Sequence, residues 1–151
     1  MRTQIRVAGI LVIDGAVLLE NAIGTDLWNL PGGRLEDAET LQLAVRREFQ
    51  EEMGLAVACT EMLVVNENFF PLGGDVMREY GFYFRVRALD PGVSPATAIK
   101  SREARFRYVW HPIETLADID FKPVALVQHL VDPPAGTLFL ETRDATLIGQ
   151  R

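Results

Sequence analysis

Hydrophobic and polar positions alternate along much of the chain with the two-residue period of β-strands. A run of β-branched and aliphatic residues from Ile5 to Ile13 leads into Asp14-Gly15, a dipeptide that favours a type I′ turn, and then into Ala16 to Glu20. This pattern predicts a β-hairpin. Similar patterns predict later strands at 27–33, 55–70, 76–89 and 104–110, separated by loops rich in glycine and proline.

Between the strands predicted at 27–33 and 55–70, the spacing of hydrophobic residues changes to the period of a helix. Strong helix formers run from Ala38 to Met53, with acidic residues at 36, 37 and 39 in the expected first turn, where the helix dipole favours anions. Gly54 stands where a left-handed C-cap belongs. At about 100° per residue, an apolar stripe faces the core, and it consists of Leu41, Ala44, Val45 and Phe49.

Three carboxylates fall on or beside this apolar stripe: Glu48 and Glu52 on it and Glu51 at its edge. Such a cluster is costly, because like charges at this spacing repel, anions near a helix C-terminus oppose the dipole, and desolvated carboxylates need partners. Arg47 neighbours Glu51 on the helix and relieves part of the repulsion. A hard divalent cation, Mg²⁺ or Mn²⁺, would balance the rest. A solvated charged helix face is disfavoured, because the acids share the apolar side.

The stretch from 33 to 55 resembles the Nudix box, G-x5-E-x7-R-E-U-x-E-E-x-G-U, in which U is a bulky apolar residue. Both spacers have the right length, and the fixed positions are filled by Gly33, Glu39, Arg47, Glu48, Phe49, Glu51, Glu52, Gly54 and Leu55. The preceding Trp28 to Gly33 segment is similar to the Trp-x-Leu-Pro-Gly-Gly lead-in of the family. The resemblance implies a Nudix-type α/β/α sandwich with a mixed sheet, which suits the predicted order of hairpin, helix, strands and helix.

The resemblance also implies an activity, the Mg²⁺-dependent hydrolysis of a nucleoside diphosphate linked to another moiety, with Mn²⁺ able to substitute. Nucleoside triphosphates and nucleotide sugars such as ADP-ribose are substrates of this kind. Breaking a phosphoanhydride requires neutralised phosphate charge, an oriented water and a base. Specificity in the family comes from segments outside the box, so the substrate stays open.

The resemblance suggests a role for each box residue. We predict Glu48 and Glu52 as direct metal ligands, and Glu51 as a ligand or the base. Arg47 orients a neighbouring carboxylate, and the family's main-chain carbonyl ligand maps to Gly32. Glu39 lies on the opposite side of the helical wheel and is expected to tie the loop to the helix, so it is structural, as are Gly33 and Gly54.

Candidates outside the box carry a weaker signal. They are a further ligand or base at Glu79 or Glu103, phosphate contacts at Arg78 or Arg102, and base stacking by Trp28, Phe69, Phe70 or Tyr80. For each charged residue a solvated position is at least as well supported, and aromatic residues in strands are more often core. His111 and His129 lack a partner at metal-ligand spacing and are read as structural or surface residues.

The C-terminal part is expected to form a second helix and a tail. Asp120 is predicted to cap a helix reaching Val131, with Val124, Val127 and Val131 on its apolar face and Pro133-Pro134 ending it. The tail from 137 to 147 should add an edge strand or meet a partner subunit. We assign residues 1–151 to a single domain, with 134–151 as the strand or dimer-contact tail of a homodimer.

Composition narrows the function classes. The chain has 151 residues, of which 48% are hydrophobic and 24% charged, as is ordinary for a soluble globular domain. The formal net charge of −6 argues against nucleic acid or an anionic membrane as partner and leaves a small-molecule nucleotide. The single Cys59 excludes an intramolecular disulfide, and no signal segment or membrane-length apolar run is present, so a cytoplasmic location is expected.

Three other functions are less well supported by the sequence than hydrolysis of a small-molecule nucleotide. A non-catalytic Nudix module that binds a nucleotide would be favoured by missing box glutamates, but all are present. An isoprenyl diphosphate isomerase shares the fold but uses a cysteine upstream of the helix, whereas Cys59 lies after it. An RNA-cap hydrolase receives no support from a basic stripe.

Overall fold

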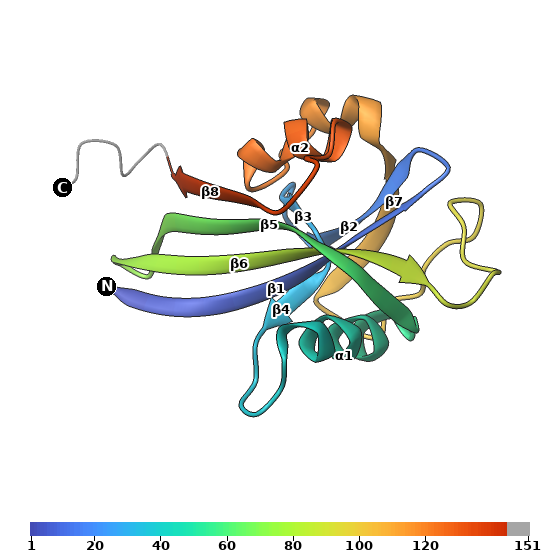
Figure 1. Cartoon of the computed structure of the whole chain (residues 1–151), viewed down its shortest axis with the longest axis horizontal. Helices are drawn as coiled ribbons and strands as arrows, with labels where there is room; N and C mark the ends of the chain where they lie inside the picture. Colours follow the sequence, from blue (N-terminus) through green and yellow to red (C-terminus); the bar gives the residue numbers. More distant parts are fainter. Residues whose placement is uncertain (145–151) are drawn as a thin grey trace.

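The computed structural model describes residues 1–144, which form a mixed eight-stranded sheet with helical segments on both faces (Figure 1). In chain order the elements are β1 (Arg2–Ile13), β2 (Ala16–Ala22), β3 (Trp28–Asn29), β4 (Gly32–Arg34), α1 (Leu41–Met53), β5 (Val57–Leu72), β6 (Asp75–Ala88), β7 (Phe106–Pro112), the 3₁₀ turns η1 (Ile113–Asp118) and η2 (Val124–Leu126), α2 (Val127–Val131) and β8 (Leu138–Arg143). None of the helices within residues 1–144 is both long and apolar enough to cross a membrane.

The sheet runs in the order β3-β2-β1-β6-β5-β8, with β4 paired to β1 and β7 paired to β2. The predicted hairpin is confirmed: Asp14 and Gly15 have φ angles of 51° and 74°, as a type I′ turn requires. Its two strands pair only at Val12↔Val17 and Ile13↔Ala16. Along the rest of their length, β1 pairs with β4 and β6, while β2 pairs with β7 and β3. This divergence makes room for a cleft beside β4.

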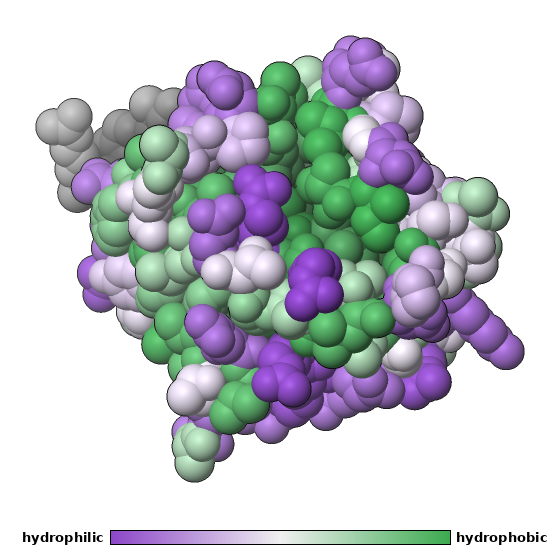
Figure 2. All heavy atoms as spheres, turned by 45° about the vertical axis from the view of Figure 1, so that its right-hand side comes forward, coloured by the Kyte–Doolittle hydropathy of each residue, from purple (hydrophilic) through white to green (hydrophobic). Residues whose placement is uncertain are grey.

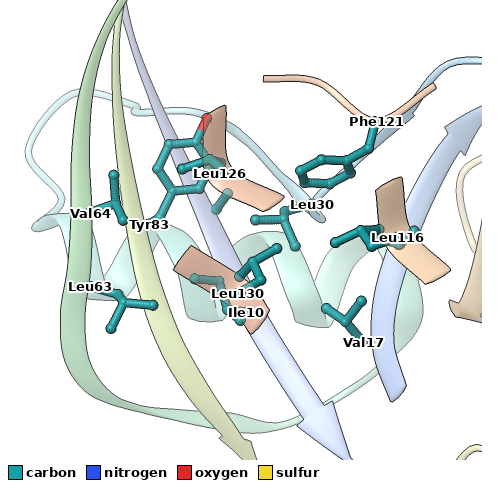
Figure 3. Packing of buried hydrophobic residues seen from close by; sticks show 12 residues of the cluster. Ile10, Val17, Leu30, Leu63, Val64, Tyr83, Leu116, Phe121, Leu126 and Leu130 are labelled. Atoms are coloured by element: carbon teal, nitrogen blue, oxygen red, sulfur yellow. The ribbon is translucent and has the colours of Figure 1, made fainter. Parts of the chain in front are cut away.

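Two hydrophobic cores lie on opposite faces of the sheet. The core under α1 includes Ala44, Val45 and Phe49, all fully buried, so the predicted apolar stripe is confirmed. The other core lies beneath η1, η2 and α2 (Figure 3). Gly9 permits the close approach of α1, because a Cβ at this position would overlap the Phe49 ring. The mixed sheet covered on both faces confirms the predicted fold class.

Helix α1 begins three residues later than the sequence pattern predicts. Ala38 has a φ of 63°, which is incompatible with a continuing right-handed helix. Thr40 is the N-cap instead, and its Oγ1 accepts a hydrogen bond from the Leu43 N–H at 3.2 Å. The acids at 36, 37 and 39 therefore lie in the preceding loop and not in the first turn. The predicted C-cap is confirmed, since Gly54 has a φ of 66°.

The second predicted helix is largely wrong. Asp120 does not cap it; its carbonyl accepts from the Trp28 N–H at 2.9 Å, and Phe121 bridges to Trp28. Only η2 and the five-residue α2 follow. Their buried side chains are Leu126 and Leu130, whereas the expected apolar positions 124 and 131 are 62% and 56% exposed.

Strand β8 confirms an edge strand in the tail, where it pairs in parallel with β5. The predicted positions 145–147 lie outside the described residues. The contact with a partner subunit and the single-domain assignment stay predictions. The expected turn at 71–75 narrows to Gly73-Gly74, because β5 and β6 continue up to it.

Candidate active site

Four residues at fixed positions of the predicted box, Gly33, Glu48, Glu51 and Glu52, border a cleft with a volume of about 540 Å³. It lies between the second half of α1, strands β1, β2, β4 and β6, and the segment 102–106. Its acidic side chains are Glu20, Glu48, Glu51, Glu52, Glu79 and Glu103, and its cations are Arg6, Arg34, Arg102 and Arg105. Gly32 and Gly33 form part of its wall.

The three glutamates of helix α1 differ in how deeply they are buried. Glu48 is buried, Glu52 is half-buried and Glu51 is exposed, as the spacing predicts for a residue at the stripe's edge. Glu48 reaches into the space beside Gly33, where a Cβ would overlap its carboxylate. Gly33 in β4 therefore lets the loop pass directly against this acid. A Cβ on Gly32 would overlap the Val7 carbonyl, so its role is close backbone packing.

Arg47 is the organising cation next to the cleft. Its guanidinium donates to Glu39 at 2.7 and 2.9 Å, to Glu48 Oε1 at 3.0 Å and to Glu51 Oε2 at 3.2 Å. The hydrogen bonds from Arg47 lower the pKa of Glu39 to about 2. Glu39 also accepts from the Glu36 N–H at 2.8 Å and thereby ties the loop to the helix. The geometry agrees with the orienting role expected of Arg47.

Sequence reasoning missed Glu20, a residue of β2 that is 3% exposed. Tyr108 of β7 places its hydroxyl 3.2 Å from Glu20 Oε1 and 2.8 Å from Glu52 Oε2, and Arg6 lies 3.5 Å from the other oxygen of Glu20. Burial, followed by the charge of Glu20, raises the pKa of Glu52 to about 9. The two-residue period of β2 puts Glu20 on the same face as Leu18, which packs in the α1 core; that signal could have identified it.

Two acids from outside the box also reach the cleft. Glu79 of β6 is buried and accepts a hydrogen bond from the Gln4 amide, whose Oε1 is itself buried without a partner in residues 1–144. Glu103 is half-buried and accepts from Arg105 Nε at 3.2 Å. The hydrogen bonds from Arg105 lower the pKa of Glu103. Both residues therefore border the cleft, and their role as ligand or base stays a prediction.

Most of the other weak candidates lie away from the cleft. Arg78 sits over the Tyr80 ring at 5.9 Å, and Phe70 pairs across to Met77 on β6. Phe69 lies under Arg143 and Trp28 under Arg107. Arg102 does border the cleft, where it packs against Gly54. None of the four candidate stacking aromatics lines this cleft.

A second hollow of about 420 Å³ lies elsewhere, between the ends of β1 and β6 and the loop after β6. Its wall includes Leu11, Val86, Pro91 and Val93, and none of the box residues. Apolar side chains also gather in a hollow bordered by polar ones on the face shown in Figure 2. Because the acidic cleft contains the box glutamates and this second hollow does not, the cleft is the candidate site.

The donor chemistry of the cleft suits a hard divalent cation. The box glutamates and the Gly32 carbonyl offer only oxygen, which Mg²⁺ and Mn²⁺ prefer. Within residues 1–144, no three Asp, Glu, His or Cys side chains converge closely enough to hold an ion already. Arg47 and Tyr108 instead satisfy the carboxylates. The donor set fits the metal, although its oxygens would have to draw together.

A loop and helix that present glutamates to a cleft beside the strands of a mixed sheet are typical of a Nudix-type domain. The chain belongs to this family, because the NUDIX domain model matches residues 3–130. Members of the family typically use divalent metals. The prediction of a Nudix fold and family from the box is confirmed.

Individual relatives support the same placement. The chain is 30% identical over 122 residues to an RNA pyrophosphohydrolase from Halorhodospira halophila. This match covers 70% of this chain and 67% of that protein. It is 49% identical over 43 residues to an 8-oxo-dGTP diphosphatase from Proteus vulgaris, covering 28% of this chain and 38% of that protein. For three relatives, this diphosphatase, a second RNA pyrophosphohydrolase and a MutT-like protein, the match spans only 37 to 43% of the relative's own length.

A solved structure extends the likeness to the fold. The Mutator MutT protein from Bacillus halodurans has a TM-score of 0.71 at 17% identity, and the match covers 95% of this chain and 92% of that chain. At this identity the likeness establishes architecture and leaves the substrate to other evidence.

Proposed function

We propose that the chain is a Mg²⁺-dependent pyrophosphohydrolase that cleaves a nucleoside diphosphate linked to another moiety, and that Mn²⁺ can replace Mg²⁺. A nucleoside triphosphate or a nucleotide sugar such as ADP-ribose is the substrate class. The observation that carries the proposal is the arrangement of the cleft, where the glutamates of α1 face a set of arginines. Carboxylates hold cations and arginines hold phosphate oxygens, so one cleft can take both parts of a metal-nucleotide complex.

The metal would be held by Glu48, Glu52 and the Gly32 carbonyl, with Glu51 as a further ligand or the base. When bound, the ion supplies positive charge against the bridging phosphates. Family membership and the all-oxygen donor set support this assignment.

Two arginines of the chain are available to the phosphates. Arg34 and Arg102 border the cleft and form no salt bridge within residues 1–144, so their guanidinium groups are not committed to a carboxylate. The main chain fixes Arg102, whose N–H donates to the Glu52 carbonyl at 2.7 Å. These cations would orient the anhydride against the acidic side of the cleft.

Glu51 and Glu103 are the candidates for the base. Glu51 is exposed beside the cleft and can accept a proton from a water. Glu103 is a weaker base, because its hydrogen bonds with Arg105 stabilise the ionised form. We therefore assign the proton-accepting role to Glu51.

The test is the hydrolysis of a panel of nucleotides with Mg²⁺, with Mn²⁺ and with EDTA, measured by chromatography of the phosphate-bearing products. The panel contains dGTP, 8-oxo-dGTP, ADP-ribose, a sugar nucleotide, a dinucleoside polyphosphate and a 5′-triphosphorylated RNA. Metal-dependent turnover of one class is expected. Glu52→Gln should reduce it at least about 100-fold, because even the outer partners of metal ligands contribute about 10–100-fold.

Glu61→Gln is the matched control. Glu61 is an exposed acid on β5 that pairs with Arg85 at 2.9 Å, and it does not border the cleft. This variant should keep wild-type turnover. Nucleotide binding without turnover of any substrate would contradict the proposal and favour a non-catalytic nucleotide-binding module.

A further inference from the structure

Behind Glu52, a buried chain of polar contacts crosses four elements of the fold. Arg6 of β1 donates to the Leu30 carbonyl at 2.9 Å and lies 3.5 Å from Glu20 of β2. Glu20 contacts the Tyr108 hydroxyl of β7, and that hydroxyl contacts Glu52 of α1. Glu20 and Tyr108 are 3% and 4% exposed, so water does not compete for these contacts.

The geometry fixes the direction of the last contact. A tyrosine hydroxyl has a single hydrogen to donate. The hydroxyl of Tyr108 is 2.8 Å from Glu52 Oε2 but 3.2 Å from Glu20 Oε1, so its hydrogen bond goes to Glu52. The Oε2 atom of Glu52 is thereby bonded to Tyr108, and its other carboxylate oxygen stays available to bind a cation in the cleft. Glu48 is also close to Glu52 there.

We infer that Tyr108 is a positioning residue that presents Glu52 to the divalent cation. The inference rests on the proposed function, since it concerns the same metal site. Packing alone does not account for this tyrosine, because phenylalanine would fill the same space without placing a hydroxyl between two carboxylates. An outer partner of this kind fixes the orientation of a metal ligand and so raises metal affinity.

The test measures Mn²⁺ affinity directly, from the electron paramagnetic resonance signal of free Mn²⁺ in protein solutions without nucleotide. Tyr108→Phe should bind Mn²⁺ about 10-fold more weakly than wild type. Tyr80→Phe is the matched control: its hydroxyl also donates to a carboxylate, Glu67 at 2.7 Å, but it lies outside the cleft. This control should bind as wild type does. Thermal unfolding in EDTA shows whether both variants keep their fold.

Wild-type Mn²⁺ affinity in Tyr108→Phe would overturn the inference. If wild type itself fails to bind Mn²⁺, the metal chemistry of the proposed function fails as well, and that failure is recognised because it precedes any substitution.

Discussion

Arg47 shows how much of the site depends on a single side chain. Its guanidinium joins Glu39 in the loop before α1 to Glu48 and Glu51 within the helix. It is only 19% exposed, so these charge-assisted hydrogen bonds are partly shielded from water. The loop and the helix are therefore held together by the same group that orients the candidate metal ligands.

The Glu39–Arg47 contact predicts a pH dependence of stability. Arg47 lowers the pKa of Glu39 from 4.5 to about 2, so the folded state binds this proton less readily than the unfolded state. The contact therefore stabilises the fold fully above pH 4.5, and that stabilisation is lost as the pH falls towards 2. Glu39→Gln should be less stable than wild type at neutral pH, and the difference should shrink across this window.

Urea unfolding in EDTA at a series of pH values measures this difference. Asp118→Asn, which removes an exposed acid on η1, is the control and should differ little from wild type at any pH. A wild-type to Glu39→Gln difference that stays constant between pH 6 and pH 3 would contradict the assigned cause of the pKa shift.

At the scale of elements, the two helices differ in how far the sequence predicts them. In α1 the apolar period, the burial of Ala44, Val45 and Phe49, and the Gly54 cap all agree over 13 residues. The later helical segment offers two competing apolar faces, one of valines at 124, 127 and 131 and one of leucines at 126 and 130. Because α2 has only 5 residues, periodicity cannot decide between these faces; packing against the sheet selects the leucines.

The choice between these two faces is testable with neighbouring substitutions. Leu130 is 6% exposed in the core of Figure 3, so Leu130→Ala should lower the free energy of unfolding by about 2–4 kcal/mol. Val131 is 56% exposed, so Val131→Ala should change it by no more than about 0.5 kcal/mol. Denaturant unfolding of both variants measures the contrast, and equal losses would contradict the orientation of α2.

At the scale of the whole molecule, the site depends on pairings that local patterns do not contain. Alternation along β1 indicates which residues face each core, but not that β1 pairs in parallel with β6, far along the chain. Glu48, Glu51 and Glu52 could be predicted because helix spacing alone groups them. Glu20 and Tyr108 meet Glu52 only when β2 and β7 are paired and α1 is docked on the sheet, so this part of the site required the assembled fold.

Metal removal tests whether this assembly behaves as a metal site. An ion that binds only the folded chain adds about 2.7 kcal/mol at 100 times its dissociation constant. Because 1 kcal/mol shifts the melting temperature of a chain of this size by roughly 2–4 °C, wild type should melt about 5–10 °C higher in Mn²⁺ than in EDTA.

The variants should differ in this Mn²⁺-dependent rise of the melting temperature. Glu52→Gln should lose most of the rise, because it lacks one of the candidate metal ligands, whereas Glu61→Gln should keep it. The rise for Tyr108→Phe should lie between those of Glu52→Gln and wild type. Scanning calorimetry of the wild type and the three variants, each in Mn²⁺ and in EDTA, measures these melting temperatures. Equal melting temperatures of wild type in Mn²⁺ and EDTA would contradict the assignment of the cleft as a metal site.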